Sequence, residues 1–152
     1  MNGQNSTTNQ KQNPVQAAPA PNIGSENISL PVILLVEDDP VLSKMYTEKF
    51  KFEGFSVLTA ANGEDGLHVA LTQKVDLILL DLMLPRLSGT ELLARLREDP
   101  KGKGVVVVAL TNLAEEEEKQ KAIQLGVKEY LIKAMQTPEE VVKKVKGYIG
   151  KS

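Results

Sequence analysis

The sequence contains no cysteine among its 152 residues. The protein therefore has no disulfide, no thiolate metal site and no cysteine nucleophile, as is common in a reducing cytosol. It also lacks an apolar run near the roughly 18 residues that a membrane-spanning helix needs. Its N-terminus lacks the basic and apolar regions of a signal peptide. The net charge of −2 gives no general reason to bind nucleic acid or an acidic membrane. We expect a cytoplasmic protein with no direct nucleic-acid or membrane binding.

The first 29 residues are poor in apolar and in charged side chains. They contain six Asn, four Gln and three Pro, and only Lys11 and Glu26 are charged. So few apolar residues cannot bury one face of a helix or a strand. We therefore predict a disordered tail over residues 1–29 and one folded domain over residues 30–152.

From Leu30 onward, short apolar runs alternate with segments of helical periodicity. A run that is apolar at successive positions, such as residues 77–80, predicts a strand buried on both faces. We expect strands at residues 30–36, 55–59, 77–81, 105–110 and 130–132. Helix starts are indicated by Asp39 before Pro40, and by capping-box patterns at 88–91 and 137–140. Strict alternation predicts an α/β fold with a doubly wound, five-stranded parallel sheet. We expect the flavodoxin-like (βα)5 arrangement with strand order 2-1-3-4-5.

Acidic side chains follow two of these strands at the point where each strand ends. Glu37 and Asp38 follow the first strand, and Asp81 ends the third. In this type of sheet, ligands bind beyond the carboxyl ends of strands one and three. Three crowded carboxylates repel one another, and a divalent cation relieves that repulsion. We predict a Mg²⁺ site with Asp38 and Asp81 as direct ligands, Glu37 acting through water, and the backbone carbonyl of Met83 completing the set.

A hydroxyl and an amine are expected at the same edge of the sheet. Thr111 ends the fourth strand and can donate a hydrogen bond, and Lys133 lies just past the fifth strand and can supply a positive charge. With a metal, these groups suit phosphoryl transfer to Asp81, which would become an aspartyl phosphate. Taken singly, Asp81 could be a turn residue, Thr111 a loop residue and Lys133 a solvated charge. Their joint placement at strand ends favours a functional site.

The residues around these positions form motifs that resemble the receiver domain of two-component response regulators, of the chemotaxis-regulator type. The resemblance spans about residues 30–149, and its motifs are 35–40 (LVEDDP), 81–85 (DLMLP) with Gly89, 109–111 (ALT) and 130–133 (YLIK). It implies these roles: an acidic pair of Glu37 and Asp38, a phosphorylated Asp81, a switch hydroxyl on Thr111, a switch aromatic in Tyr130 and a pocket lysine in Lys133. The phosphodonor would be a sensor histidine kinase or a phosphotransfer protein. The chain would catalyse only its own phosphorylation and dephosphorylation, so we do not expect an enzyme of another kind.

The resemblance also implies how the signal leaves the domain. Thr111 would move toward the phosphoryl group and Tyr130 would turn inward, which changes the face formed by helix four, strand five and helix five. Because only Gly150, Lys151 and Ser152 follow the last helix, we expect a single-domain, stand-alone regulator. Its surface would then act on a downstream protein target, or form a phosphorylation-dependent homodimer.

Two residues depart from the family pattern. Ala134 follows Lys133 where receivers usually have proline, often after a cis bond. A cis bond before a non-proline residue costs roughly 2.5–4 kcal/mol, which disfavours a cis bond here, but the sequence leaves the isomer of the Lys133–Ala134 bond open. Asn112 follows Thr111 where a smaller residue is usual. We hypothesise that its bulk hinders water and lengthens the phosphorylated lifetime.

Other functions fit the sequence less well. The main alternative is a pseudo-receiver that is not phosphorylated and acts as a protein-interaction module. A flavin-binding electron carrier is disfavoured because the first strand ends in acidic residues instead of a phosphate cradle. A hydrolase would need a second aspartate just after Asp81, and Met83 occupies that position.

Overall fold

The computed structural model describes residues 29–149, so the predicted disordered tail lies outside the described residues except for Ser29. Strands and helices alternate along this part of the chain, as the sequence predicted. In order, they are β1 Val32–Val36, α1 Pro40–Phe52, β2 Ser56–Ala60, α2 Gly63–Thr72, β3 Leu77–Leu80, α3 Gly89–Glu98, β4 Val106–Thr111, α4 Glu116–Gln124, β5 Glu129–Ile132, the 3₁₀ turn η5 Lys133–Met135, and α5 Pro138–Tyr148.

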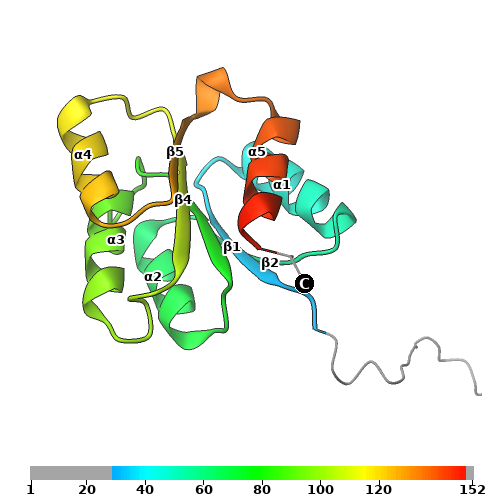
Figure 1. Cartoon of the computed structure of the whole chain (residues 1–152), viewed down its shortest axis with the longest axis horizontal. Helices are drawn as coiled ribbons and strands as arrows, with labels where there is room; N and C mark the ends of the chain where they lie inside the picture. Colours follow the sequence, from blue (N-terminus) through cyan, green and yellow to red (C-terminus); the bar gives the residue numbers. More distant parts are fainter. Residues whose placement is uncertain (1–28, 150–152) are drawn as a thin grey trace, which may run out of the picture. The chain divides into compact units, whose positions relative to one another are not determined.

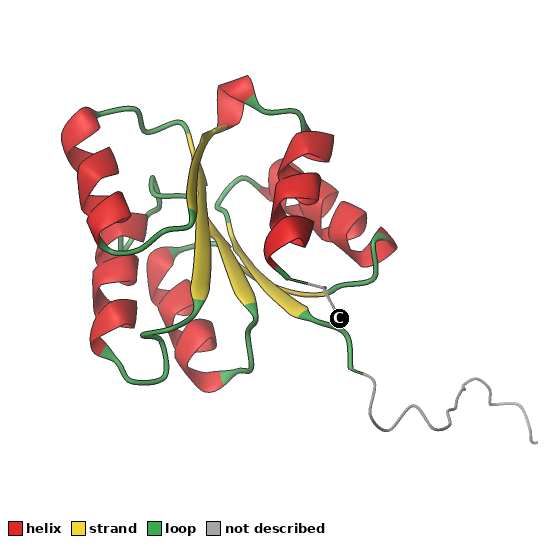
Figure 2. Cartoon of the chain, viewed as in Figure 1, coloured by secondary structure: helices red, strands yellow, loops and turns green. Residues whose placement is uncertain are grey.

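The strands form one parallel sheet in the order β2-β1-β3-β4-β5, which confirms the predicted fold class (Figure 2). The register pairs Val36 of β1 with Leu80 of β3. The residues that follow these two, Glu37 and Asp81, therefore leave the sheet at the same edge. A hydrogen bond from the Asp81 N–H to the Val36 carbonyl, 3.0 Å long, extends the pairing to that point.

Helices cover both faces of the sheet (Figure 1): α1 and α5 lie on one face, and α2, α3 and α4 lie on the other. Successive residues of β1 serve the two cores in turn. Leu34 and Val36 pack with residues of α2 and α3, whereas Ile33 and Leu35 pack with residues of α1 and α5. This two-sided burial explains the uninterrupted apolar runs in the sequence. Within residues 29–149, no helix has both the length and the apolar character needed to cross a membrane.

Side-chain caps fix where several helices begin. The Asp39 carboxylate accepts hydrogen bonds from the N–H groups of the first turn of α1, as predicted. Thr137 and Glu140 form the complete predicted capping box at α5. At α3 the structure contains the serine half of the box, with Ser88 Oγ accepting from the Glu91 N–H, while the Glu91 carboxylate lies 3.8 Å from Arg95.

Two glycines let the loop after β3 pack closely against the neighbouring helices. A Cβ added to Gly89 would lie 2.4 Å from the backbone oxygen of Asp81 and 2.5 Å from the Cα of Leu82. A Cβ added to Gly63 would lie 1.8 Å from the backbone oxygen of Leu87. Both clashes involve backbone atoms, which cannot rotate away. The two glycines therefore hold the loop that begins at Asp81 against α2 and α3.

Candidate functional site

The predicted acidic residues lie together at the carboxyl ends of β1 and β3. One carboxylate oxygen from each of Glu37, Asp38 and Asp81 lies within 4.8 Å of the other two. Glu37 and Asp81 are each 5% exposed, whereas Asp38 is open to solvent. Two buried carboxylates this close need compensating charge, because burying an unpaired charge is costly.

Lys133 supplies part of that charge. Its Nζ lies 2.7 Å from Glu37 Oε1 and 2.8 Å from Asp81 Oδ2, and its side chain is 17% exposed. The residue begins η5 directly after β5. Its peptide bond to Ala134 is trans, as expected for a bond that does not precede proline. The amine thus joins the ends of the first, third and fifth strands.

Burial disfavours the charged form of both Glu37 and Lys133, but only at Lys133 do the hydrogen bonds outweigh it. Burial raises the pKa of Glu37, and the hydrogen bonds from Lys133 and from the Asp39 N–H only partly offset that rise. Burial alone would lower the pKa of the Lys133 amine, but the hydrogen bonds to Asp81 and Glu37 outweigh it and leave the pKa raised. The cation is therefore stabilised, while the glutamate anion is not fully compensated. A further cation at this cluster would relieve the remaining cost.

The donor set suits Mg²⁺, which prefers hard oxygen ligands and usually combines one or two carboxylates with several waters. Asp38 is exposed and could bind such an ion directly, beside the buried oxygens of Asp81 and Glu37. Met83 lies two residues past Asp81, and its N–H donates to Asp81 Oδ1 at 3.0 Å. The loop backbone therefore folds back over the aspartate, and the Met83 side chain points outward with 55% exposure.

Thr111 and Tyr130 lie on β4 and β5, and both are tied to the same loop residue. Thr111 is fully buried, and its Oγ1 accepts a hydrogen bond from the Leu113 N–H at 3.1 Å. The Tyr130 hydroxyl donates to the Leu113 carbonyl at 2.5 Å, and the Lys119 amine lies 5.7 Å from the centre of its ring. Burial, followed by the charge of Glu118, raises the pKa of Tyr130. In this conformation both hydroxyl groups hold the β4–α4 loop.

This arrangement is matched by known proteins. The family model described as the response regulator receiver domain matches residues 33–146. The chain belongs to this family. Receiver domains are phospho-acceptor signalling modules of two-component systems, not turnover enzymes, and histidine kinases are their partners. The acidic cluster described above is typical of the magnesium site of a receiver. The resemblance inferred from the motifs is thereby confirmed.

Solved structures agree with this receiver in fold. A CheY-like response regulator receiver domain protein from Methanospirillum hungatei JF-1 has a TM-score of 0.73 and 29% identity, and the match covers 78% of this chain and 93% of that one. The receiver domain of the sensor histidine kinase PA1611 from Pseudomonas aeruginosa PAO1 has a TM-score of 0.72 and 30% identity, with 81% and 100% covered. That crystal structure contains a magnesium ion coordinated in the active-site cleft.

Curated relatives include the phosphate regulon transcriptional regulatory protein PhoB of Rhizobium meliloti. It is 37% identical over 111 residues, which cover 72% of this receiver chain and 48% of the relative. The chain spans about half the length of most of the curated relatives it matches. The whole-protein activities of those relatives therefore do not transfer to this receiver.

One contact beside the receiver pocket was missed by the sequence reasoning. The Asn112 side-chain oxygen accepts a hydrogen bond from the Ala134 N–H at 3.1 Å. These are the two positions that depart from the family pattern, and the sequence alone gave no sign that they are in contact. The sheet order could have indicated the contact, because β4 and β5 are neighbours and Thr111 pairs with Ile132 at their shared end.

Proposed function

We propose that this receiver accepts a phosphoryl group on Asp81 with the help of Mg²⁺ and thereby switches a protein-interaction surface made of α4, β5 and α5. The observation that carries the proposal is the environment of the Asp81 carboxylate. It is buried at the end of the central strand, with the Lys133 amine 2.8 Å from one oxygen and the Met83 N–H 3.0 Å from the other. Glu37 and Asp38 lie beside it.

The proposed metal ligands are Asp38 and Asp81 directly, Glu37 through water, and the backbone carbonyl of Met83. The grouping of three carboxylates and the magnesium ion in the related Pseudomonas aeruginosa receiver support this assignment. When bound, Mg²⁺ neutralises charge on the phosphoryl oxygens during transfer. The raised pKa of Glu37, caused first by its burial, is consistent with a pocket that accepts additional positive charge.

In the proposed transfer, an Asp81 oxygen attacks phosphorus as an ionised carboxylate. The new oxygen–phosphorus bond forms while the bond from phosphorus to the donor breaks, and the donor atom keeps the electron pair. That atom is a histidine nitrogen in a phosphorylated kinase, or a carboxylate oxygen in a small acyl phosphate. The Lys133 amine then contacts a phosphoryl oxygen, as a fixed positive charge suited to phosphate.

The proposed switch starts at Thr111 and passes through Leu113 to Tyr130. If the Thr111 side chain rotates so that its hydroxyl donates to a phosphoryl oxygen, Oγ1 moves away from the Leu113 N–H and loses the hydrogen bond that it now accepts from it. The Leu113 carbonyl holds the Tyr130 hydroxyl, so movement of the loop releases the tyrosine to turn inward. A local charge event thus biases an element with two arrangements.

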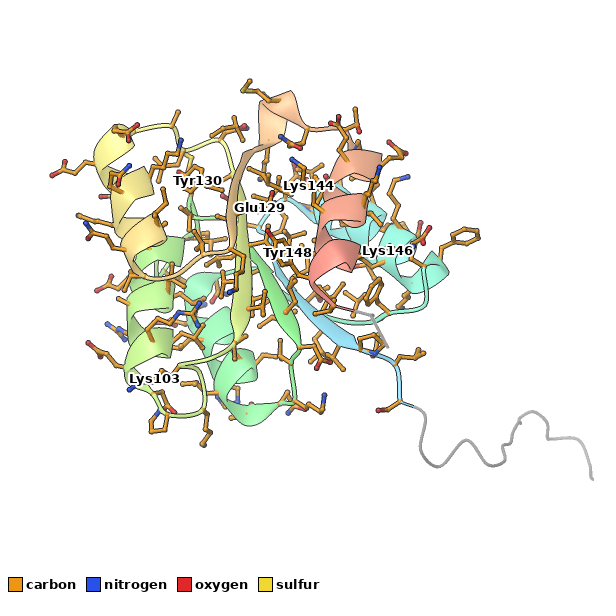
Figure 3. All side chains as sticks on the ribbon, viewed as in Figure 1. Lys103, Glu129, Tyr130, Lys144, Lys146 and Tyr148 are labelled. Carbon is orange, nitrogen blue, oxygen red and sulfur yellow. The ribbon has the colours of Figure 1, made fainter. Side chains whose placement is uncertain are left out.

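The surface that would change lies on α4, β5 and α5. Figure 3 shows Glu129 of β5 beside Lys144 and Tyr148 of α5; the Tyr148 hydroxyl donates to Glu129 at 2.8 Å, and the Lys144 amine lies 3.9 Å away. We propose a sensor histidine kinase or phosphotransfer protein as the phosphodonor. A downstream protein or a second copy of the chain would read this surface. We place these events in the cytoplasm.

Intact mass spectrometry tests the proposal directly. The protein is incubated with Mg²⁺ and acetyl phosphate, and we expect an added mass of one phosphoryl group that is lost on standing. Asp81→Asn should abolish the adduct. Asp99→Asn should retain it, because Asp99 follows the C-terminal end of α3, away from the pocket. Absence of an adduct on the parent protein would favour the alternative, an interaction module that is not phosphorylated.

A further inference from the structure

The two loops that flank the pocket on its β4–β5 side are joined by a side chain. The ladder between β4 and β5 ends at the pair Thr111 and Ile132. Beyond it, one chain turns toward α4 and the other enters η5, drawn in orange at the end of β5 in Figure 1. Asn112 Oδ1 accepts the Ala134 N–H across this gap at 3.1 Å. Only the oxygen of the amide can accept from an N–H, so the orientation of the Asn112 amide is determined.

This hydrogen bond acts on the peptide group that follows Lys133. The N–H of that peptide belongs to Ala134 and is held by Asn112. Its carbonyl belongs to Lys133 and accepts the Gln136 N–H at 3.2 Å. Both polar ends of one rigid peptide plane are therefore fixed. The direction in which the Lys133 side chain leaves the backbone is fixed with them.

The position of that backbone matters because the Lys133 side chain spans to two buried partners. Its amine reaches Glu37 at 2.7 Å and Asp81 at 2.8 Å. A long side chain that is 17% exposed has few other ways to satisfy its charge. Asn112 itself is exposed and touches neither carboxylate through a hydrogen bond. The hydrogen bond from the Ala134 N–H therefore gives Asn112 a route to the pocket through Ala134 and Lys133.

We propose that Asn112 is a positioning residue for phosphoryl transfer: its side-chain oxygen holds the Lys133–Ala134 peptide so that the Lys133 amine lies against Asp81. The proposal rests on the proposed function of Asp81 as the phosphoryl acceptor. It concerns the rate of phosphoryl transfer and is separate from the hypothesis that the bulk of Asn112 lengthens the phosphorylated lifetime. Ala134 is also needed for this hydrogen bond, because proline at that position would have no N–H to donate.

Three substitutions at Asn112 separate the hydrogen bond from the bulk. Asn112→Leu keeps the size and removes the acceptor, Asn112→Ala removes both, and Asn112→Asp keeps the accepting oxygen. The rate of adduct formation from acetyl phosphate is measured at saturating Mg²⁺ and raised ionic strength, which screens the charge added by aspartate. We expect Asn112→Leu and Asn112→Ala to slow the rate by about two- to tenfold, the span that corresponds to one net hydrogen bond. Asn112→Asp should stay within about twofold of the parent, because it retains that bond.

Two further measurements test the route through Lys133. In a Lys133→Met background, Asn112→Leu should cause little additional loss, because the side chain being positioned is already gone. Amide hydrogen exchange at Ala134 should become faster in Asn112→Leu and Asn112→Ala, and this readout does not need phosphorylation. Urea unfolding followed by circular dichroism checks that each variant folds.

Several results would overturn the inference. A parent-like rate in Asn112→Leu would show that the acceptor is not needed, and an equal loss in Asn112→Asp and Asn112→Leu would show that retaining it does not help. Unchanged exchange at Ala134 would show that the bond does not protect that N–H. These results would leave phosphorylation of Asp81 intact, whereas a parent protein that forms no adduct would reject the proposed function and the inference together.

Discussion

Replacing Lys133 by methionine removes the cation that compensates the buried carboxylates while keeping most of the side-chain length. The amine lies 2.7 Å from Glu37 and 2.8 Å from Asp81, and both acidic residues are 5% exposed. Breaking a buried ion pair by removing one partner typically costs about 3–5 kcal/mol. Because the lysine side chain keeps 17% exposure, we expect the lower part of that range, about 3–4 kcal/mol of lost unfolding free energy without Mg²⁺.

The loss should depend on pH and on metal in predictable directions. Burial already raises the pKa of Glu37, and without the amine it should rise further. A carboxyl whose folded-state pKa is raised destabilises the fold above its unfolded-state value, about 4.3 for glutamate, and this cost disappears as the pH falls. The deficit of Lys133→Met should therefore be largest near neutral pH. Mg²⁺ should recover more stability in the variant than in the parent, because the competing positive charge is gone.

Urea unfolding followed by far-ultraviolet circular dichroism measures these differences, with EDTA or Mg²⁺ at several pH values. Lys143→Met is the matched control, because Lys143 is exposed on α5, and it should change stability by less than about 0.5 kcal/mol. A deficit for Lys133→Met that is no larger than the control, at neutral pH and without metal, would refute the reasoning. So would a deficit that grows as the pH falls.

Three further predictions concern residues that stabilise the fold. Gly89→Ala should lower the free energy of unfolding by about 1–3 kcal/mol and slow phosphorylation, since the new Cβ would lie 2.4 Å from the Asp81 backbone oxygen. Gly147→Ala is the control: nothing lies within 4 Å of its Cβ, so it should be neutral or stabilising in urea unfolding. Asp76→Asn should cost about 1 kcal/mol at neutral pH by weakening the 2.7 Å hydrogen bond from the Val32 N–H. Burial raises the pKa of Asp76, but this hydrogen bond and Lys74 leave it lowered. The cost should therefore be complete above the ordinary aspartate pKa of about 3.9 and should be lost as the pH falls through the lower folded-state pKa. Arg97→Met should cost about 2 kcal/mol or more in the same assay, because the guanidinium donates to backbone carbonyls of both the α3–β4 and α4–β5 loops.

The fold and the acidic part of the site were predictable because they depend on local pattern and sheet topology. Apolar runs identified the strands, and the alternation with helices gave their order. Topology then placed Glu37 and Asp81 at one edge without any knowledge of contacts. Element boundaries were less accurate: the first strand was expected over residues 30–36 and spans Val32–Val36.

The loop contacts were not predictable, because they depend on how two irregular segments meet in space. The turn η5 and the bond between Asn112 and Ala134 carry no periodic signal in the sequence. The same is true of Leu113, whose N–H and carbonyl serve Thr111 and Tyr130. An apolar side chain at that position gives no indication that its backbone is the functional part. Such roles are visible only once the direction of each peptide group is known.

The pocket combines two kinds of support that have different mechanical properties. Its carboxylates follow β1 and β3, whose residues are almost wholly buried and paired on both sides, so their positions change little. Its amine and hydroxyl follow β4 and β5, where the ladder ends and side-chain hydrogen bonds take over. Each of those hydrogen bonds contributes little free energy, so it can be exchanged for a hydrogen bond to a phosphoryl group. A fixed aspartate beside exchangeable loop contacts suits the proposed function, in which a charge added at Asp81 changes the loop arrangement.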